Sequence, residues 1–213
     1  MSRVWYLPRK EVFFQHIPKC AGRSITAWLT GNRGDIVECG GDTSHFEECN
    51  WKNTFTSIRN PFGRLVSHYK SLFKAGELHY VIQHSDICFS EYVHKVVSLE
   101  HVEPDFAVMV YGELYEEDPN AQWDMITRIH TAPLTHPYNS ANKFEDVIRF
   151  ENLDEDFFNL VQKYDIVPID NFTLLDHHNK TIVSDYWQYY DYKTRDMVTE
   201  FYKEDLLTFD YRF

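Results

Sequence analysis

A lysine, a glycine and a serine between a predicted strand and a predicted helix are the first residues in this chain suited to chemistry. The segment runs His16-Ile17-Pro18-Lys19-Cys20-Ala21-Gly22-Arg23-Ser24. A loop that leaves a strand and enters a helix directs backbone N–H groups outward, and the helix dipole adds positive potential there. Lys19 adds a charge, Gly22 permits close backbone approach and Ser24 adds a hydroxyl. The segment therefore predicts an anion-binding loop.

A second basic segment comes after the next predicted strand, about 40 residues further along the chain. It reads Ile58-Arg59-Asn60-Pro61-Phe62-Gly63-Arg64-Leu65-Val66-Ser67-His68-Tyr69. Arg59, at the strand end, can form a charge-assisted fork to a phosphate, and Ser67 on the next helix can donate a hydroxyl hydrogen bond. Arg64 either adds charge or braces the turn. Taken together, the two segments favour a ligand with two anionic groups.

Both segments resemble the cofactor signatures of sulfotransferases that use 3′-phosphoadenosine 5′-phosphosulfate (PAPS). The first is similar to the 5′-phosphosulfate loop, and the second fills every fixed position of the 3′-phosphate signature Arg-x-Pro-x-x-Arg-x-x-Ser-x-Tyr. The resemblance implies that Lys19 contacts the phosphosulfate bridge and that Arg59 and Ser67 hold the 3′-phosphate. It assigns the 5′-phosphate to the rest of the loop, namely Cys20, Ala21, Gly22, Arg23, Ser24 and Ile25.

The resemblance extends less specifically to later segments, 148–153 and 190–211, which look like carbohydrate sulfotransferases of the membrane-enzyme type. It leaves residues 77–140 unaligned. Lys180 lies where the family often closes a loop over the cofactor, so it is a candidate for a further phosphate contact, with a solvated lysine as the alternative. The implied reaction is transfer of a sulfonate group from PAPS, leaving PAP, to an acceptor hydroxyl.

Such a transfer needs a general base with a pKa near neutrality, within reach of the acceptor hydroxyl. His45 precedes the second predicted strand and looks placed like the histidine base of some carbohydrate sulfotransferases. Glu47 or Glu48 is the alternative base. His16 and His68 lie inside the two signatures, where we expect them to pack or orient the motifs.

The composition of the chain excludes some classes of binding partner. The chain has 213 residues and a formal charge of −12, which disfavours nucleic acid and heavily sulfated glycans as partners. We expect a hydroxyl-bearing acceptor, a carbohydrate or another small molecule. The sequence shows no apolar run of the ~20 residues that a membrane helix needs, which predicts a cytoplasmic or otherwise soluble protein. Its four cysteines lack zinc-site spacing, and no metal is expected.

Strands alternating with helices must position these residues. We expect strands at 12–17, 54–58 and 146–150, and helices at 24–30, 60–75 and 89–99, then from about 151 to 164 and within 186–209. A further strand is predicted at 106–111. The pattern predicts an α/β fold with a mainly parallel central sheet flanked by helices, formed as one domain over residues 1–213.

Two other classes of protein remain open. A P-loop nucleotide kinase would need its lysine after the glycine, but here Lys19 precedes Gly22. A non-catalytic module that binds PAP or a glycan would keep the pocket without turnover. Intact Lys19, Arg59 and Ser67 count against that second reading.

Overall fold

The chain divides into two compact units, each built from two separate stretches of sequence. The computed structural model describes residues 3–33, 36–40, 46–47, 50–72, 87–99, 127–167, 173–176 and 185–213. One unit comprises Met1–Arg59 and Ser140–Lys180 and contains the sheet, so it is called the sheet unit. The other comprises Asn60–Asn139 and Thr181–Phe213 and is called the helical unit. The strand predicted at 106–111 lies outside the described residues.

A five-stranded sheet in the order β3-β1-β2-β4-β5 forms the centre of the sheet unit. Its strands are β1 (Arg3–Leu7), β2 (Val12–His16), β3 (Val37–Gly40), β4 (Thr54–Ile58) and β5 (Asp146–Arg149). Strand β4 pairs in parallel with both β2 and β5, whereas β1 pairs antiparallel with β2 and β3. Four of the five described strands therefore point in one direction, which confirms the predicted α/β fold with a mainly parallel sheet. The sequence analysis missed β1 and β3.

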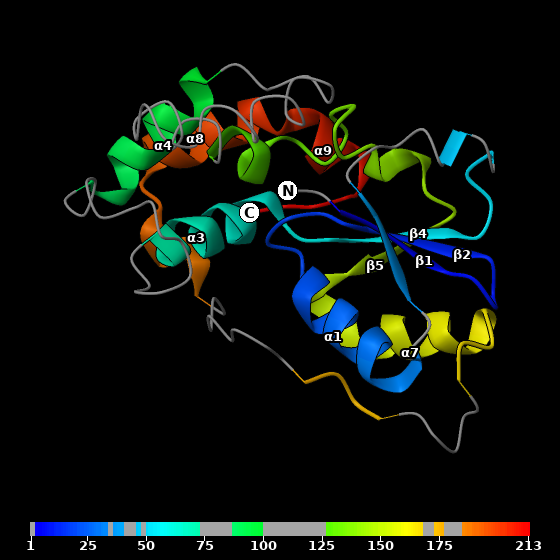
Figure 1. Cartoon of the computed structure of the whole chain (residues 1–213). Helices are drawn as coiled ribbons and strands as arrows, with labels where there is room; N and C mark the ends of the chain where they lie inside the picture. The colour runs from blue at the N-terminus through cyan, green and yellow to red at the C-terminus, as the bar shows by residue number, and fades with distance from the viewer. Residues whose placement is uncertain are drawn as a thin grey trace, which may run out of the picture. The chain divides into compact units, whose positions relative to one another are not determined.

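Helices α1 (Gly22–Arg33) and α7 (Leu153–Lys163) cover one face of this sheet (Figure 1). Phe14, Phe55 and Ile148 from three neighbouring strands reach the core beneath these helices. Trp28 of α1 packs edge-on against Phe157 of α7, with ring centroids 5.0 Å apart. Val12 of β2 belongs to the same core as Phe14, two residues further on, because side chains alternate between the two faces of a strand.

Helices α3 (Pro61–Leu72), α4 (Phe89–Ser98), α8 (Tyr192–Phe201) and α9 (Lys203–Thr208) build the helical unit, together with the 3₁₀ turn η5 (Tyr186–Tyr189). Phe62, Tyr92 and Val198 are members of its apolar core. The helices predicted near 60–75 and 89–99 and in the tail are confirmed over these described spans.

A buried carboxylate ties the C-terminal helix of this unit to the chain before it. Asp205 has no exposed surface and accepts hydrogen bonds from the N–H groups of Leu134 (2.7 Å) and Thr135 (2.9 Å), and from the Thr135 hydroxyl (2.9 Å). Burial raises the pKa of Asp205 above its ordinary value, although these hydrogen bonds and the Arg64 charge oppose the shift. Three donated hydrogen bonds offset much of the cost of burying this group.

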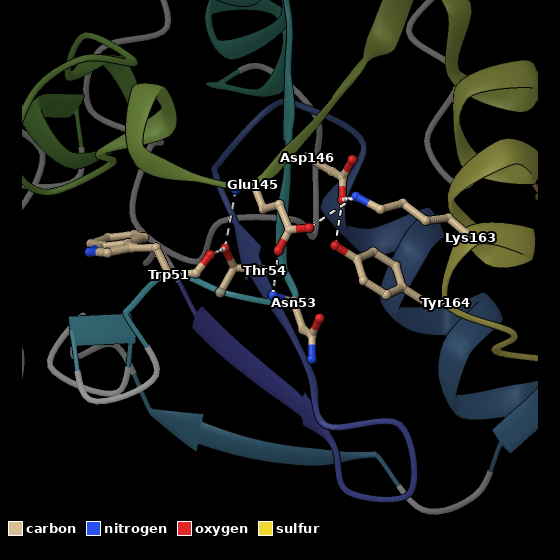
Figure 2. Close-up of polar contacts among 7 residues, drawn as sticks. All are labelled: Trp51, Asn53, Thr54, Glu145, Asp146, Lys163 and Tyr164. Atoms are coloured by element: carbon tan, nitrogen blue, oxygen red, sulfur yellow. Dashed lines mark hydrogen bonds and ion pairs between the residues drawn. The ribbon is translucent and has the colours of Figure 1, made fainter.

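At the amino ends of β4 and β5, a polar network joins both strands to the end of α7 (Figure 2). The Lys163 ammonium lies 2.6 Å from an Asp146 oxygen and 3.2 Å from a Glu145 oxygen. The other Glu145 oxygen accepts the Asn53 N–H at 2.7 Å, and the Tyr164 hydroxyl donates to Asp146. Burial first, and then the hydrogen bond to Asp146, raise the pKa of Tyr164 above its ordinary value of 10.0. The network therefore depends on a protonated tyrosine.

Tyr164→Phe removes this hydroxyl, so we expect the free energy of unfolding at neutral pH to fall by about 1 kcal/mol. Because the folded-state pKa lies above 10.0, the contribution of Tyr164 is complete below pH 10.0 and is lost as pH rises further. Urea denaturation at increasing pH should show the gap between wild type and variant shrinking above pH 10.0. Tyr192→Phe, at a tyrosine that is 81% exposed, is the control and should change little at neutral pH. A gap independent of pH would contradict the assignment.

Candidate functional site

Three parallel neighbours in the sheet unit, β2, β4 and β5, end at the same edge of the sheet. Their register pairs Gln15 with Thr56 and Ile58 with Arg149. Continuing this register places the residues just beyond the strands next to one another: the loop after His16, then Arg59, then Phe150. The carboxyl edge of parallel strands is where open α/β sheets bind ligands.

The loop between β2 and α1 has an unusual backbone. Lys19 and Ala21 have positive φ values of 67° and 68°, whereas Cys20 between them does not. Alternation of this kind turns successive N–H groups toward one side and forms the concave arrangement that binds anions. The N–H groups of Ser24 (2.9 Å) and Ile25 (3.2 Å) donate to the Ala21 carbonyl and so begin α1. The loop thus combines this concave backbone with a helix amino terminus.

Gly22 is required by a close contact inside this loop. A Cβ atom added there would lie 1.8 Å from His16 Cδ2 and 2.3 Å from His16 Cγ. The His16 ring therefore packs directly on the Gly22 backbone, as expected for a histidine that orients the motif. Cys20 and Ile25 are fully buried beneath the loop, and Ser24 is 4% exposed. Arg23 is exposed on the first turn of α1.

Arg59 links the loop to the neighbouring strand. Its side chain is 5% exposed, and its Nη1 group donates to the Lys19 carbonyl at 3.5 Å. Its guanidinium carbon lies 3.9 Å from the centroid of the Phe150 ring. Arg59 thus contacts both Lys19 and Phe150, and these three residues follow the carboxyl ends of β2, β4 and β5.

Sequence reasoning missed Phe150 and the residues that fix it. The Asp156 carboxylate accepts the Arg149 N–H at 2.8 Å and the Asn152 side-chain amide at 2.7 Å. These two bonds hold the short 3₁₀ helix η3 (Phe150–Asn152) at the end of β5. The sequence offered one signal for this contact, which was the aromatic residue Phe150 at the end of the strand predicted at 146–150.

The remaining residues of the second signature lie on α3 in the helical unit. Asn60 begins this helix, because its side-chain oxygen accepts the Phe62 N–H at 3.0 Å, and its amide donates to the Arg212 carbonyl at 2.7 Å. The polar side chains of this signature on α3 are buried: Arg64 is 2% exposed, Ser67 7% and His68 0%. Other parts of the helical unit cover this side of the helix.

Arg64 is almost fully buried within this unit. Its Nη1 group donates to the Ala132 carbonyl at 2.7 Å. His68 Nδ1 lies 2.8 Å from the Tyr92 hydroxyl, so this histidine also packs within its unit, as expected. The candidate bases His45 and Glu48 and the candidate phosphate contact Lys180 lie outside the described residues. Glu47, the other candidate base, is described and exposed.

The geometry defines an α/β protein in which a strand-to-helix loop with two left-handed residues lies next to an arginine at the carboxyl edge of the sheet. A family model described as "Sulfotransferase family" matches residues 2–212. The chain therefore belongs to the sulfotransferase family. Comparisons with curated proteins and with solved structures gave no match.

The described part of the chain contains neither a candidate membrane-spanning helix nor a candidate metal-binding group of side chains. Within those residues, no helix combines the length and apolar character needed to cross a bilayer. Nor do the same residues contain a group of three or more histidine, cysteine, aspartate or glutamate side chains arranged to hold a metal ion.

Gly22→Ala is expected to lower the free energy of unfolding by about 1–3 kcal/mol, because the new methyl group overlaps the His16 ring. Gly31→Ala in the same helix is the matched control, since a Cβ there meets nothing within 4 Å. Alanine at that helical position should leave stability unchanged or raise it by up to about 1 kcal/mol. Urea denaturation measures both. The double variant Gly22→Ala/His16→Ala should recover part of the loss, and equal losses in single and double variants would contradict the contact.

Proposed function

We propose that the protein transfers a sulfonate group from PAPS to a hydroxyl of an acceptor, with a carbohydrate as the first candidate. The observation that carries this proposal is the contact between Arg59 and the Lys19 carbonyl, which brings the first residue of the second signature to the loop between β2 and α1. In a chain with a formal charge of −12, two cationic side chains at a concave backbone give local positive potential that most of the surface lacks. The sulfotransferase family membership supports the same reaction class.

The loop residues fit the 5′ end of the donor. The alternating φ values at Lys19 and Ala21 suit a backbone that a phosphate approaches closely. We assign the 5′-phosphate to the loop residues Cys20 to Ile25, including the Ser24 hydroxyl. Arg23, exposed on the first turn, adds charge there. Lys19 is assigned to the bridging oxygen between phosphate and sulfonate.

Arg59 and Ser67 are assigned to the 3′-phosphate, with Lys180 as a candidate for a further contact. Arg59 suits the task because a largely buried guanidinium can donate several hydrogen bonds in a fixed plane. Ser67, 7% exposed on α3, adds a hydroxyl donor. PAPS would supply an activated sulfonate group when bound.

The reaction then proceeds by in-line displacement. The acceptor oxygen forms a bond to sulfur while the bond between sulfur and the bridging oxygen breaks, and the acceptor proton passes to a base. Lys19 stabilises the negative charge that develops on the bridging oxygen. His45 is the proposed base, and Glu47 or Glu48 is its alternative. The acidic surface favours an acceptor without dense sulfation.

A nucleotide kinase and a non-catalytic binding module are the competing functions. A thermal-shift panel with PAP, ATP and GTP separates them, because a ligand that binds the folded state raises its stability according to its affinity. A shift with PAP alone supports the proposal. A shift with ATP and magnesium but none with PAP would favour the kinase, and PAP binding without sulfonate transfer to any hydroxyl acceptor would favour the binding module.

Arg59→Ala should weaken PAP binding by about 2 kcal/mol or more, since a charged hydrogen-bond donor is lost from a largely buried position. Binding of 5′-AMP, which lacks the 3′-phosphate, should fall much less. Calorimetry measures both constants. Lys52→Ala, at an exposed lysine of the same unit, is the control and should bind both ligands like the wild type. Equal losses for PAP and 5′-AMP in Arg59→Ala would contradict the role in reading the 3′-phosphate.

Lys19→Ala and His45→Ala should both reduce kcat more than they weaken PAP binding, because both groups act on charge or protons that move in the transition state. For His45→Ala the expected loss in kcat is roughly 10²- to 10⁴-fold. The wild-type rate should rise with pH through a pKa of ~6 to 7, because neutral imidazole accepts the proton. An unchanged pH profile in an active His45→Asn variant would move the role to Glu47 or Glu48, where glutamine substitutions test it.

A further inference from the structure

The aromatic ring at the end of β5 touches the arginine that the proposed function assigns to the 3′-phosphate. The guanidinium carbon of Arg59 lies 3.9 Å from the centroid of the Phe150 ring, well within the distance of ~6 Å at which cation–π attraction acts. Arg59 is 5% exposed, so water screens this contact little. The attraction is strongest for such desolvated pairs.

The backbone that carries this ring is fixed on both sides. Ile58 pairs in parallel with Arg149, so the residues that follow them, Arg59 and Phe150, lie at the same level along the strand direction. The Asp156 carboxylate then accepts the Arg149 N–H and the Asn152 amide, which anchors the residues before and after the ring. The sheet and the first turn of α7 therefore fix the position of the Phe150 ring against which Arg59 packs.

The other side of Arg59 contacts the anion loop. Its Nη1 group donates to the carbonyl of Lys19, a residue whose φ of 67° is rare for a side chain of its type. The guanidinium is thus placed by the Phe150 ring and the Lys19 carbonyl together. An arginine placed by two partners loses less side-chain entropy when it binds an anion, and preorganisation of this kind raises affinity.

We propose that Phe150 is a positioning residue that sets the selectivity of the site for a ligand bearing a 3′-phosphate. It acts through Arg59 and does not itself contact the phosphate. This inference rests on the proposed function, because it needs Arg59 to bind that group. It adds the prediction that selectivity depends on an aromatic ring that directly follows a third strand, outside both cofactor signatures.

Phe150→Leu keeps an apolar side chain but removes the ring face, so the Arg59 guanidinium must be ordered when PAP binds and PAP affinity should fall roughly three- to tenfold. Affinity for 5′-AMP should change less than about threefold, so the ratio of the two dissociation constants should fall. Phe150→Tyr keeps the ring and should retain the wild-type ratio. Phe144→Leu is the matched control: this phenylalanine of the same unit packs on Phe46 and Trp51, and its loss should lower stability without changing the ratio.

A second measurement needs no ligand. The ring current of Phe150 should shift the NMR resonances of the Arg59 side chain upfield, and this shift should be lost in Phe150→Leu and kept in Phe150→Tyr. The inference would be overturned by an unchanged ratio of the PAP and 5′-AMP dissociation constants in a folded Phe150→Leu variant, or by Arg59 resonances that do not move on this substitution. Either result would leave the proposed function standing. Failure of the wild type to prefer PAP over 5′-AMP would overturn the proposed function and this inference together.

Discussion

Parallel pairing of β2, β4 and β5 is the constraint on which the candidate site depends. Parallel strands place their carboxyl ends at one edge, and the register of Gln15 with Thr56 and of Ile58 with Arg149 fixes which residues are neighbours just beyond the strands. Because side chains alternate along a strand, a slip of one residue would reverse the faces of β4 and move Phe55 out of the core. The same slip would separate Arg59 from Phe150. Core packing and site geometry are therefore set by one register.

The anion loop carries a conformational cost that its surroundings must offset. Two non-glycine residues in the left-handed region, Lys19 and Ala21, each cost about 1–3 kcal/mol. Ile17, Cys20 and Ile25 are fully buried around the loop, and each apolar side chain that leaves water contributes free energy of similar size. Packing below the loop thus offsets the strain of its two left-handed residues.

The elements that could be predicted from the sequence are those with a local pattern. Two strand-to-helix units have such a pattern, one around Lys19 and one around Arg59. Each carries turn residues and apolar spacing within a short window. The four-residue strand β3 has no such signal, whereas β1 carries the strand formers Val4, Trp5 and Tyr6 before a turn, a local signal that the sequence analysis overlooked. The burial of Ser67 and His68 depends on residues distant in sequence, which helical periodicity alone does not encode. Phe150 was missed for a related reason, since its importance comes from strand order rather than from a motif.

The sheet unit carries two kinds of polar chemistry at its opposite edges. At the amino ends of β4 and β5, Lys163 and Tyr164 neutralise and bond the Glu145 and Asp146 carboxylates (Figure 2). At the carboxyl ends, the Arg59 guanidinium contacts a backbone carbonyl and an aromatic face, both of which attract a cation without cancelling its charge. A dipole or a ring quadrupole attracts a cation without neutralising it, whereas an ion pair with a carboxylate neutralises both charges. The contacts at the amino ends are ion pairs that brace two strands against α7, and those of Arg59 at the carboxyl ends include a carbonyl dipole and an aromatic face.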